Sequence, residues 1–422
     1  MLLLDFTNLQ HVKNGFSTDQ INSFAPLADE YYQKSSTWKA QGFTDAPYNT
    51  AEIDNIKSKL AKYKGKFKNA LVLGIGGSML GLQTIVDAFS YTSDLNIVCL
   101  DNIDPYTIHA KIKKLDLNQT LVLVQTKSGG TPETLSQFFY IQSLYAKAGV
   151  DIAGHFILVT DPIAGYLRNL ANQNLGLYET FDIPANVGGR FSVLTPVGLV
   201  IAELMNLDIV EFLSGARETL KNQKIEAMQL AKIQYELSKK GVSMAVLMPY
   251  SSRLRTMSNW YVQLLSESIG KEYNLAGTKV NVGITPIPAL GATDQHSQVQ
   301  LFKDGPVDKL VMFLEVENFE ADVKISNVAL PTQFHYLDNQ TFGDLIKAEL
   351  QGTKISLTES DKPNLSIKID KVSEYSMGQI FMFLELSVAY LGELFEIDTF
   401  DQPGVERGKI AAQEILTANK IK

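Results

Sequence analysis

A carboxylate and a guanidinium stand in contexts that could serve chemistry, the first proton transfer and the second close contact with a ligand. Glu267 falls in the last turn of a helical pattern that ends at Gly270, where the negative end of the helix dipole favours proton uptake by the carboxylate. Arg190 follows Gly188 and Gly189, and two glycines let a rigid fork of donors approach a ligand closely. Taken singly, each residue has a commoner explanation: Glu267 could be a solvated carboxylate and Arg190 could form a surface salt bridge.

A second segment suits a bound phosphate. An apolar run, Thr120–Thr126, continues as Lys127-Ser128-Gly129-Gly130-Thr131-Pro132-Glu133-Thr134. The glycines permit a tight turn, threonine suits the N-cap of a helix and proline suits its first position. The free N–H groups at the helix start, together with the hydroxyls of Thr126, Ser128 and Thr131, can hold a phosphate without a metal. The alternative is an ordinary strand-to-helix turn with a capping threonine.

A glycine-rich turn after an earlier strand supports the phosphate interpretation. The turn runs from Gly74 to Gly81 and contains Gly77 and Ser78. A dinucleotide fingerprint needs a third glycine where Met79 stands, so a Rossmann dehydrogenase is disfavoured. No Walker-type lysine follows the glycines, which disfavours hydrolysis of nucleoside triphosphates. Ligands of parallel sheets bind outside the carboxyl ends of the strands, so both turns can face one crevice.

Two further groups stand near helix starts. His296 is the one histidine among polar neighbours at a predicted helix start, within Thr293–Phe302. Lys409 lies about one turn into the last helix, after the turn that contains Gln402. A surface lysine is the simpler interpretation of Lys409. The sequence contains no His-x-x-x-His motif and no cysteine cluster, so we expect no metal site.

Composition limits the class of protein. The 422 residues carry a net charge of −8, with 45% hydrophobic and 20% charged residues. This acidic balance lacks the basic face of a nucleic-acid-binding protein.

Cys99 is the only cysteine, which fits the reducing cytoplasm. The N-terminus lacks the pattern of a signal peptide. The most apolar window, Met377–Phe395, contains Glu385 and Glu393, so it predicts a buried core helix rather than a membrane helix.

Short apolar runs that alternate with helical patterns predict the framework. The runs are 70–75, 96–101, 120–126, 155–160 and 178–183, then 243–248, 282–287, 309–316 and 365–369. Such alternation is typical of βαβ units, so we predict an α/β fold of two doubly wound αβα domains with parallel-dominated sheets. The expected divisions are a helical segment over 1–60, a first αβα domain with the phosphate segment over 61–195, a second αβα domain over 196–400 and a closing helix over 401–422.

Taken together, these segments resemble the glucose-6-phosphate isomerase (phosphoglucose isomerase) family. The resemblance covers about residues 70–412 and is clearest at Gly-Gly-Arg-Phe-Ser (188–192) and Phe-Asp-Gln-Pro-Gly-Val-Glu (400–406). It implies that Glu267 shuttles a proton between C1 and C2 of the sugar, while Arg190 steadies the enediolate. His296, supplied by the second subunit of a homodimer, and Lys409 would act in ring opening. The implied substrate and phosphate contacts are Gly77, Ser78, Thr126, Lys127, Ser128, Thr131, Gly189 and Gln402.

The implied activity is reversible isomerisation of glucose 6-phosphate and fructose 6-phosphate, in glycolysis and gluconeogenesis, without a cofactor or metal. The expected location is cytoplasmic, with neither nucleic acid nor membrane as partner. One departure from the family pattern is Gly130, which replaces a threonine and removes a hydroxyl from the phosphate segment. Mannose 6-phosphate isomerisation remains an alternative. A non-catalytic sugar-phosphate sensor is disfavoured because it would not need Glu267, Arg190, His296 and Lys409 together.

Overall fold

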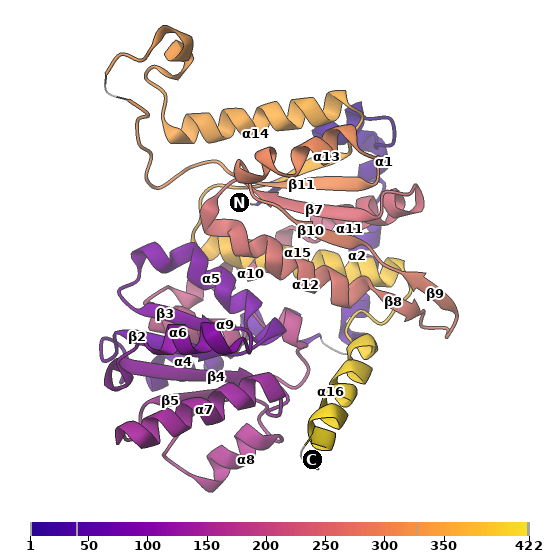
Figure 1. Cartoon of the computed structure of the whole chain (residues 1–422). Coiled ribbons are helices and arrows are strands. Elements are labelled where there is room, and N and C mark those ends of the chain that lie inside the picture. Colours follow the sequence, from indigo (N-terminus) through magenta and orange to yellow (C-terminus); the bar gives the residue numbers. More distant parts are fainter. Residues whose placement is uncertain (1, 39–40, 327, 420–422) are drawn as a thin grey trace.

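Two five-stranded sheets form the framework of the chain (Figure 1). The computed structural model describes residues 2–38, 41–326 and 328–419. The first sheet is entirely parallel and contains, in spatial order, β3 (Asn96–Leu100), β2 (Asn69–Leu73), β4 (Thr120–Thr126), β5 (Phe156–Thr160) and β6 (Glu179–Asp182). The second contains β1 (Leu3–Asp5), β12 (Asn364–Ile369), β11 (Lys309–Val316), β7 (Met244–Pro249) and β10 (Thr285–Pro288), with only β1 antiparallel. The predicted α/β fold with parallel-dominated sheets is confirmed.

Helices cover both faces of the first sheet, as a parallel sheet with apolar strands requires. Leu71 and Leu73 of β2 pack on the face covered by α6 (Pro105–Ile112), α7 (Pro132–Ala148) and α8 (Tyr166–Gln173). The intervening residues, Ala70 and Val72, face the opposite layer. That layer contains α4 (Thr50–Leu60), α5 (Leu80–Phe89) and α9 (Pro196–Leu204). Because all strands of this sheet are parallel, their carboxyl ends share one edge, and the glycine-rich turns after β2 and β4 lie there.

The second sheet is covered in the same way. Its outer face packs against α13 (Val299–Asp304) and α14 (Phe342–Glu359). Its inner face packs against α10 (Ile209–Asn222), α11 (Lys224–Lys239), α12 (Arg255–Ile269) and α15 (Glu374–Leu394). The inner faces of both sheets belong to one continuous apolar cluster, with α5 packed on α12. This shared core fixes the two sheets relative to each other and places the end of α12 beside the first sheet.

The helix α15 is the predicted apolar core helix. By length and composition it could cross a membrane, but 94% of its most apolar window is buried inside the protein. Its burial among the other helices confirms the prediction of a core helix. Glu385 lies within it with both carboxyl oxygens buried and without a hydrogen-bond partner in the described part of the chain. Burial raises the pKa of Glu385 well above its usual range, because removal from water favours the neutral form of the carboxyl group.

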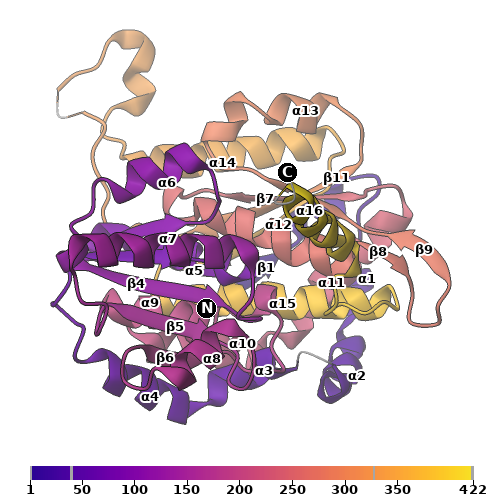
Figure 2. The ribbon, with the colours of Figure 1, turned by 60° about the horizontal axis from the view of Figure 1, so that its bottom comes forward.

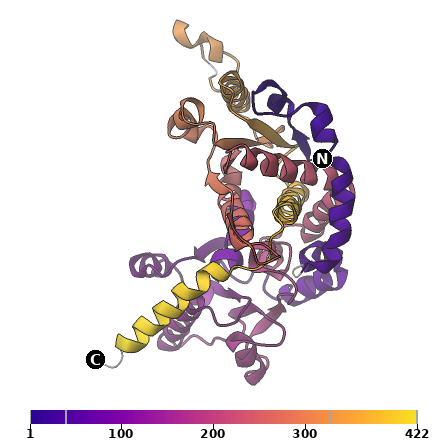
Figure 3. The same ribbon diagram turned by 90° about the vertical axis from the view of Figure 1, so that its right-hand side faces the viewer.

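Shorter elements complete the fold. The N-terminal part contains η1 (Thr7–His11), α1 (Thr18–Asn22), α2 (Ala25–Lys34), η2 (Ser35–Thr37), α3 (Gly42–Asp45) and η3 (Ala46–Tyr48), with α2 against α11. The other short elements are η4 (Gly76–Ser78), η5 (Ser90–Thr92), η6 (Leu117–Gln119), η7 (Gly189–Phe191), η8 (Ser252–Leu254), β8 (Lys271–Tyr273), β9 (Lys279–Val282), η9 (Thr293–His296), η10 (Thr332–Leu337) and η11 (Pro403–Val405). Residues 317–326 and 328–341, which include η10, extend from the body in two views (Figures 1 and 2). The last helix, α16 (Glu406–Asn419), also extends outward (Figure 3).

Candidate active site

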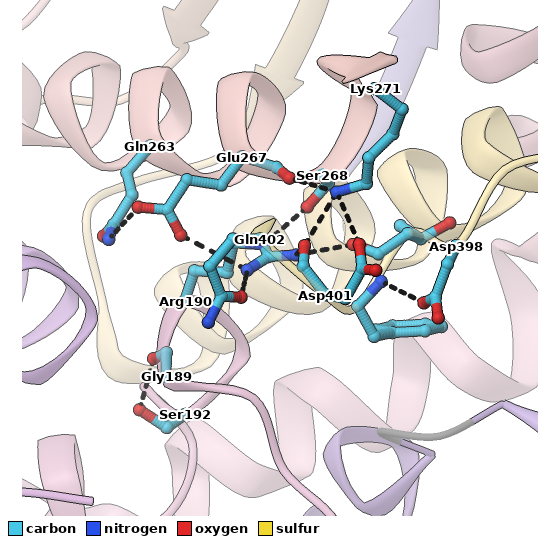
Figure 4. Close-up of polar contacts among 12 residues, drawn as sticks. Gly189, Arg190, Ser192, Gln263, Glu267, Ser268, Lys271, Asp398, Asp401 and Gln402 are labelled. Carbon is cyan, nitrogen blue, oxygen red and sulfur yellow. Dashed lines mark hydrogen bonds and ion pairs between the residues drawn. The ribbon is translucent and has the colours of Figure 1, made fainter. Parts of the chain in front are cut away.

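Arg190 is the centre of a polar cluster where η7, the end of α12 and the segment after α15 meet (Figure 4). Only 3% of this residue is exposed, and its five N–H groups face five acceptors. The acceptors are Ser268 Oγ at 2.8 Å, Glu267 Oε2 at 3.2 Å, Gln402 Oε1 at 2.8 Å, Thr399 O at 2.5 Å and Asp401 O at 3.1 Å. Burial lowers the pKa of Arg190 and the charge of Glu267 opposes this change. The guanidinium is therefore fixed in one orientation.

Close packing of two glycine turns explains how Arg190 reaches this position. A Cβ atom at Gly77 would lie 2.3 Å from the carbonyl carbon of Gly189 and 2.6 Å from the nitrogen of Arg190. Any side chain at position 77 would therefore separate η4 from η7. The structure thus brings together Gly77 and Gly189, two of the predicted binding residues, at the carboxyl edge of the first sheet.

Glu267 projects from the last turn of α12 toward Arg190. Its Oε1 atom accepts a hydrogen bond from Gln263 Nε2 at 2.9 Å, while Oε2 faces Arg190. Its side chain is 31% exposed, whereas that of Arg190 is almost completely buried. Gly270 follows the helix in an extended conformation, and glycine suits this position because a Cβ atom there would lie 2.8 Å from the carbonyl oxygen of Ser266. One carboxylate oxygen is therefore held by a cation and the other by an amide.

The predicted phosphate segment forms a cluster of three hydroxyl groups. Thr126 Oγ1 lies 2.7 Å from Thr131 Oγ1 and 3.3 Å from Ser128 Oγ, and the last two are 3.3 Å apart. Thr131 occupies the N-cap of α7, but its hydroxyl makes no capping hydrogen bond. The hydroxyl turns toward Thr126 instead and leaves the first N–H groups of α7 without a side-chain cap. Three hydroxyls beside a helix N-terminus are suited to a phosphate.

Lys127 and Ser78 support this segment from two sides. The ammonium of Lys127 donates to the carbonyl oxygens of Ala185 at 2.8 Å and Val187 at 2.7 Å. Burial lowers the pKa of Lys127. Gln125 Nε2 donates to the main-chain oxygen of Ser78 at 3.0 Å and so joins η4 to β4. In this structure Lys127 therefore ties the hydroxyl cluster to the segment that leads into η7.

An open pocket of about 610 Å³ adjoins the polar cluster around Arg190. Its volume is in the range of small-molecule sites. The lining includes Glu267, Lys271, Tyr273, Asp401, Gln402 and Val405. The pocket gives solvent access to Glu267 and Gln402, which meet at Arg190. Among the described residues, no group of three or more histidine, cysteine or acidic side chains could hold a metal ion.

Comparison with known proteins identifies the family. The family model described as phosphoglucose isomerase matches residues 53–421. The chain belongs to the phosphoglucose isomerase family. It is therefore an isomerase.

Relatives match along most of their length. A glucose-6-phosphate isomerase of Carboxydothermus hydrogenoformans is 42% identical over 399 residues, which are 89% of this chain and 84% of the relative. One from Methanocaldococcus jannaschii is 34% identical and covers 97% of this chain and 98% of its own. The solved structure of a hypothetical protein from Thermus thermophilus superimposes with a TM-score of 0.90 at 33% identity, covering 99% and 100% of the two chains. A glucose-6-phosphate isomerase from Chlamydia trachomatis shares the fold, with a TM-score of 0.82 at 22% identity over 96% and 87% of the chains.

Two residues that the family resemblance marks lie apart from the Arg190 cluster. His296 is exposed at the end of η9, which Tyr250 holds through a 3.1 Å hydrogen bond to Gln295 Oε1. Lys409 is exposed on α16 and pairs with Glu406 Oε1 at 2.7 Å. Within the part of the chain that the structure describes, neither side chain hydrogen-bonds to Arg190 or its partners. A single phosphoglucose isomerase chain thus assembles only part of the predicted set.

The cluster also contains residues that the sequence analysis did not single out. Gln263 precedes Glu267 by four residues, so helical spacing alone places both on one face of α12. Lys271 follows Glu267 by four residues and donates to the carbonyl oxygen of Glu267. Ser268 belongs to no chemical motif and is recognisable only from its contact with Arg190. Helical spacing was a signal for Gln263 alone, because Lys271 lies beyond the end of α12 in β8, and the contacts of Lys271 and Ser268 required the tertiary structure.

Proposed function

We propose that this isomerase interconverts glucose 6-phosphate and fructose 6-phosphate through a cis-enediol. The observation that carries the proposal is the ion pair between Glu267 and Arg190, 3.2 Å apart at the edge of an open pocket. Moving a proton between adjacent carbons needs one group that acts first as base and then as acid. It also needs a fixed cation for the charge that develops on oxygen. Family membership and the names of the relatives support this substrate pair.

Glu267 is the proposed base. With Gln263 on one oxygen and Arg190 on the other, the carboxylate is held in one rotamer, which suits a single proton position near C1 and C2. Arg190 has an acceptor for each of its five N–H groups before substrate arrives. An enediolate oxygen would therefore have to replace one of these acceptors. The amide oxygen of Gln402, which accepts from Nη1, is neutral and belongs to an exposed residue, so it is the acceptor that we expect to be replaced. Exchanging a neutral acceptor for a developing negative charge stabilises the transition state more than the bound substrate.

The hydroxyl cluster is the proposed phosphate site. Thr126, Ser128 and Thr131, with the N-terminus of α7, present neutral donors to a dianion. Gly77, Ser78 and Gly189 border this site through the packing of η4 on η7. Lys127 contributes charge from its position on the carbonyls of Ala185 and Val187. The hydroxyl and N–H donors are neutral, whereas Arg190 is the full cation that pairs with the proposed base Glu267.

The chain is proposed to act as a homodimer in which His296 reaches the second subunit's site and, with Lys409, opens the sugar ring. The exposure of both residues, and their separation from Glu267 in one chain, support this arrangement. Mixing Glu267→Gln chains with His296→Ala chains, each strongly impaired on fructose 6-phosphate, tests it. Random reassociation would restore about a quarter of wild-type activity, because half of the dimers would have one complete site. Failure to recover activity in verified mixed dimers would refute the exchange of His296.

We also propose a division into domains, a cellular location and a metabolic role for this isomerase. The proposed divisions are 1–60, 61–195, 196–400 and 401–422, of which the first contributes β1 to the second sheet and α4 to one face of the first sheet. The single cysteine supports a cytoplasmic setting, and the proposed substrates place the enzyme in glycolysis and gluconeogenesis. The chemistry requires no cofactor or metal.

A coupled assay tests the activity directly. Glucose 6-phosphate formed from fructose 6-phosphate is measured with chelator present, and turnover is expected. Glu267→Gln should reduce kcat by at least about a thousandfold and leave sugar-phosphate binding largely intact, since the amide cannot accept the proton. Glu203→Gln is the matched control, because this buried carboxylate pairs with Lys64 at 2.6 Å outside the site. Near-normal turnover by Glu267→Gln would refute the assignment of the base.

A further inference from the structure

Lys271 carries a positive charge into the interior beside the candidate site. It is the first residue of β8, directly after α12 and Gly270, and only 5% of its side chain is exposed. Lysine is rarely buried unless its ammonium is paired, because removing the charge from water is costly. Burial lowers the pKa of Lys271, and the neighbouring charge of Arg190 lowers it further. Two cations thus lie close together in a place where each destabilises the other.

Three acceptors compensate the ammonium of Lys271. Its Nζ atom lies 2.6 Å from the main-chain oxygen of Glu267, 2.7 Å from that of Asp401 and 3.2 Å from Asp401 Oδ1. An ammonium has three N–H donors, so these acceptors account for all of them. Figure 4 shows the side chain reaching across from β8 to both segments. The bond to Glu267 O also satisfies a free carbonyl at the C-terminus of α12.

These acceptors belong to the residues that surround Arg190. Glu267 supplies the proposed base, and Asp401 directly precedes Gln402, whose amide oxygen accepts from Arg190. The main-chain oxygen of Asp401 accepts from both Lys271 and Arg190. We infer that Lys271 is a positioning residue for the proposed isomerisation: it joins the end of α12 to the 401–402 segment, so that Glu267 and Gln402 meet Arg190 in a fixed register.

A purely structural lysine would look different. Lys362 is also buried and donates to the main-chain oxygen of Gly305 at 2.5 Å, but this bond joins two segments of the second sheet's outer layer. Removing either ammonium should destabilise the fold. Only removal of Lys271 should also change the geometry at Arg190. The pair Lys271→Met and Lys362→Met therefore separates stability from positioning.

The inference rests on the proposed function, and kinetics provide its first test. Lys271→Met should lower kcat about a hundredfold, since a displacement of about 1 Å in a reacting group costs that much. KM for fructose 6-phosphate should change less than about threefold, because the hydroxyl cluster binds the phosphate independently. Lys362→Met should lose thermal stability with kcat unchanged. A folded Lys271→Met enzyme with the kcat of Lys362→Met would overturn the inference.

Two further arms keep the test decisive. If Lys271→Met does not fold, Lys271→Gln replaces it, because its shorter neutral amide cannot span both carbonyls. A folded Lys271→Gln enzyme with wild-type kcat would equally refute positioning. A crystal structure of the variant should show Gln402 displaced from Arg190, and unchanged contacts would contradict the inference. If wild-type protein does not turn over fructose 6-phosphate, the proposed function fails, while this structural arm still tests Lys271.

Discussion

Replacing Arg190 by lysine should separate the geometry of the guanidinium from its charge. Lysine has three N–H donors on one atom, whereas Arg190 serves five acceptors. At least two acceptors therefore lose their partner, and each buried loss costs about 1–3 kcal/mol. Glu267 and Gln402 can reach water, so the lower end applies. We expect the free energy of unfolding to fall by about 2–3 kcal/mol.

The effect of Arg190→Lys on catalysis should be larger than its effect on stability. A compact ammonium cannot stay bonded to Ser268 and Thr399 while it also faces an enediolate oxygen. Loss of one preorganised donor to a developing oxyanion typically costs about a hundred- to a thousandfold in kcat, and we expect a loss in this range. The coupled assay measures kcat, and urea unfolding measures stability in the same preparations.

Arg168→Lys provides the matched control. Arg168 is also buried, donates to Asp161 O at 2.8 Å and pairs with Asp182, and it shares none of the five acceptors of Arg190. This variant should lose comparable stability and keep its kcat. A kcat of Arg190→Lys within about threefold of wild type would refute the reasoning, since charge alone would then suffice.

Three further predictions address ring opening, phosphate binding and pH. His296→Ala should slow the turnover of fructose 6-phosphate more than the turnover of a four-carbon aldose phosphate that cannot cyclise. An equal loss of turnover on both substrates would argue against a role of His296 in ring opening. Gly130→Thr should lower KM about five- to tenfold, because a Cβ atom there meets only Ser128 O at 3.8 Å and the new hydroxyl can donate to phosphate; isosteric Gly130→Val should not. Glu385→Gln should stabilise the protein above neutral pH but not near pH 4, as measured by urea unfolding. The raised pKa of Glu385 gives stability that is present at low pH and lost as pH rises through the folded-state pKa; an unchanged pH profile would contradict its buried, neutral state.

The sequence predicts the bounds of a strand well where an apolar run ends at a polar or charged residue. β4 has the predicted bounds because its apolar run meets Lys127, and β11 also has its predicted bounds. The predicted strand 282–287 is wrong in detail. Gly283 divides it between β9, which pairs with β8, and β10, which pairs with β7. β1 was missed, because three residues carry no periodic signal and its pairing with β12 is nonlocal.

Helix interiors were predicted better than their connections. The predicted helix Thr293–Phe302 is interrupted, so that η9 carries His296 and α13 begins at Val299. In the site, the residue types of Glu267 and Arg190 suggested chemistry, and the structure places them in contact. The main-chain oxygens of Thr399 and Asp401 had no such signal, because every residue has a carbonyl group and only the tertiary fold selects two of them.

The distribution of Arg190's acceptors along the chain has a consequence for biosynthesis. Ser268 lies 78 residues after Arg190, and Thr399 lies 209 residues after it. A ribosome that has released the first sheet has therefore made the hydroxyl cluster but not the partners of its neighbouring guanidinium. Until the last segment emerges, the Gly-Gly-Arg turn must remain hydrated, because a buried unpaired charge is too costly. The proposed reaction centre would thus be among the last parts of a newly made chain to form, and a product truncated before Thr399 should bind phosphate esters weakly without isomerising them.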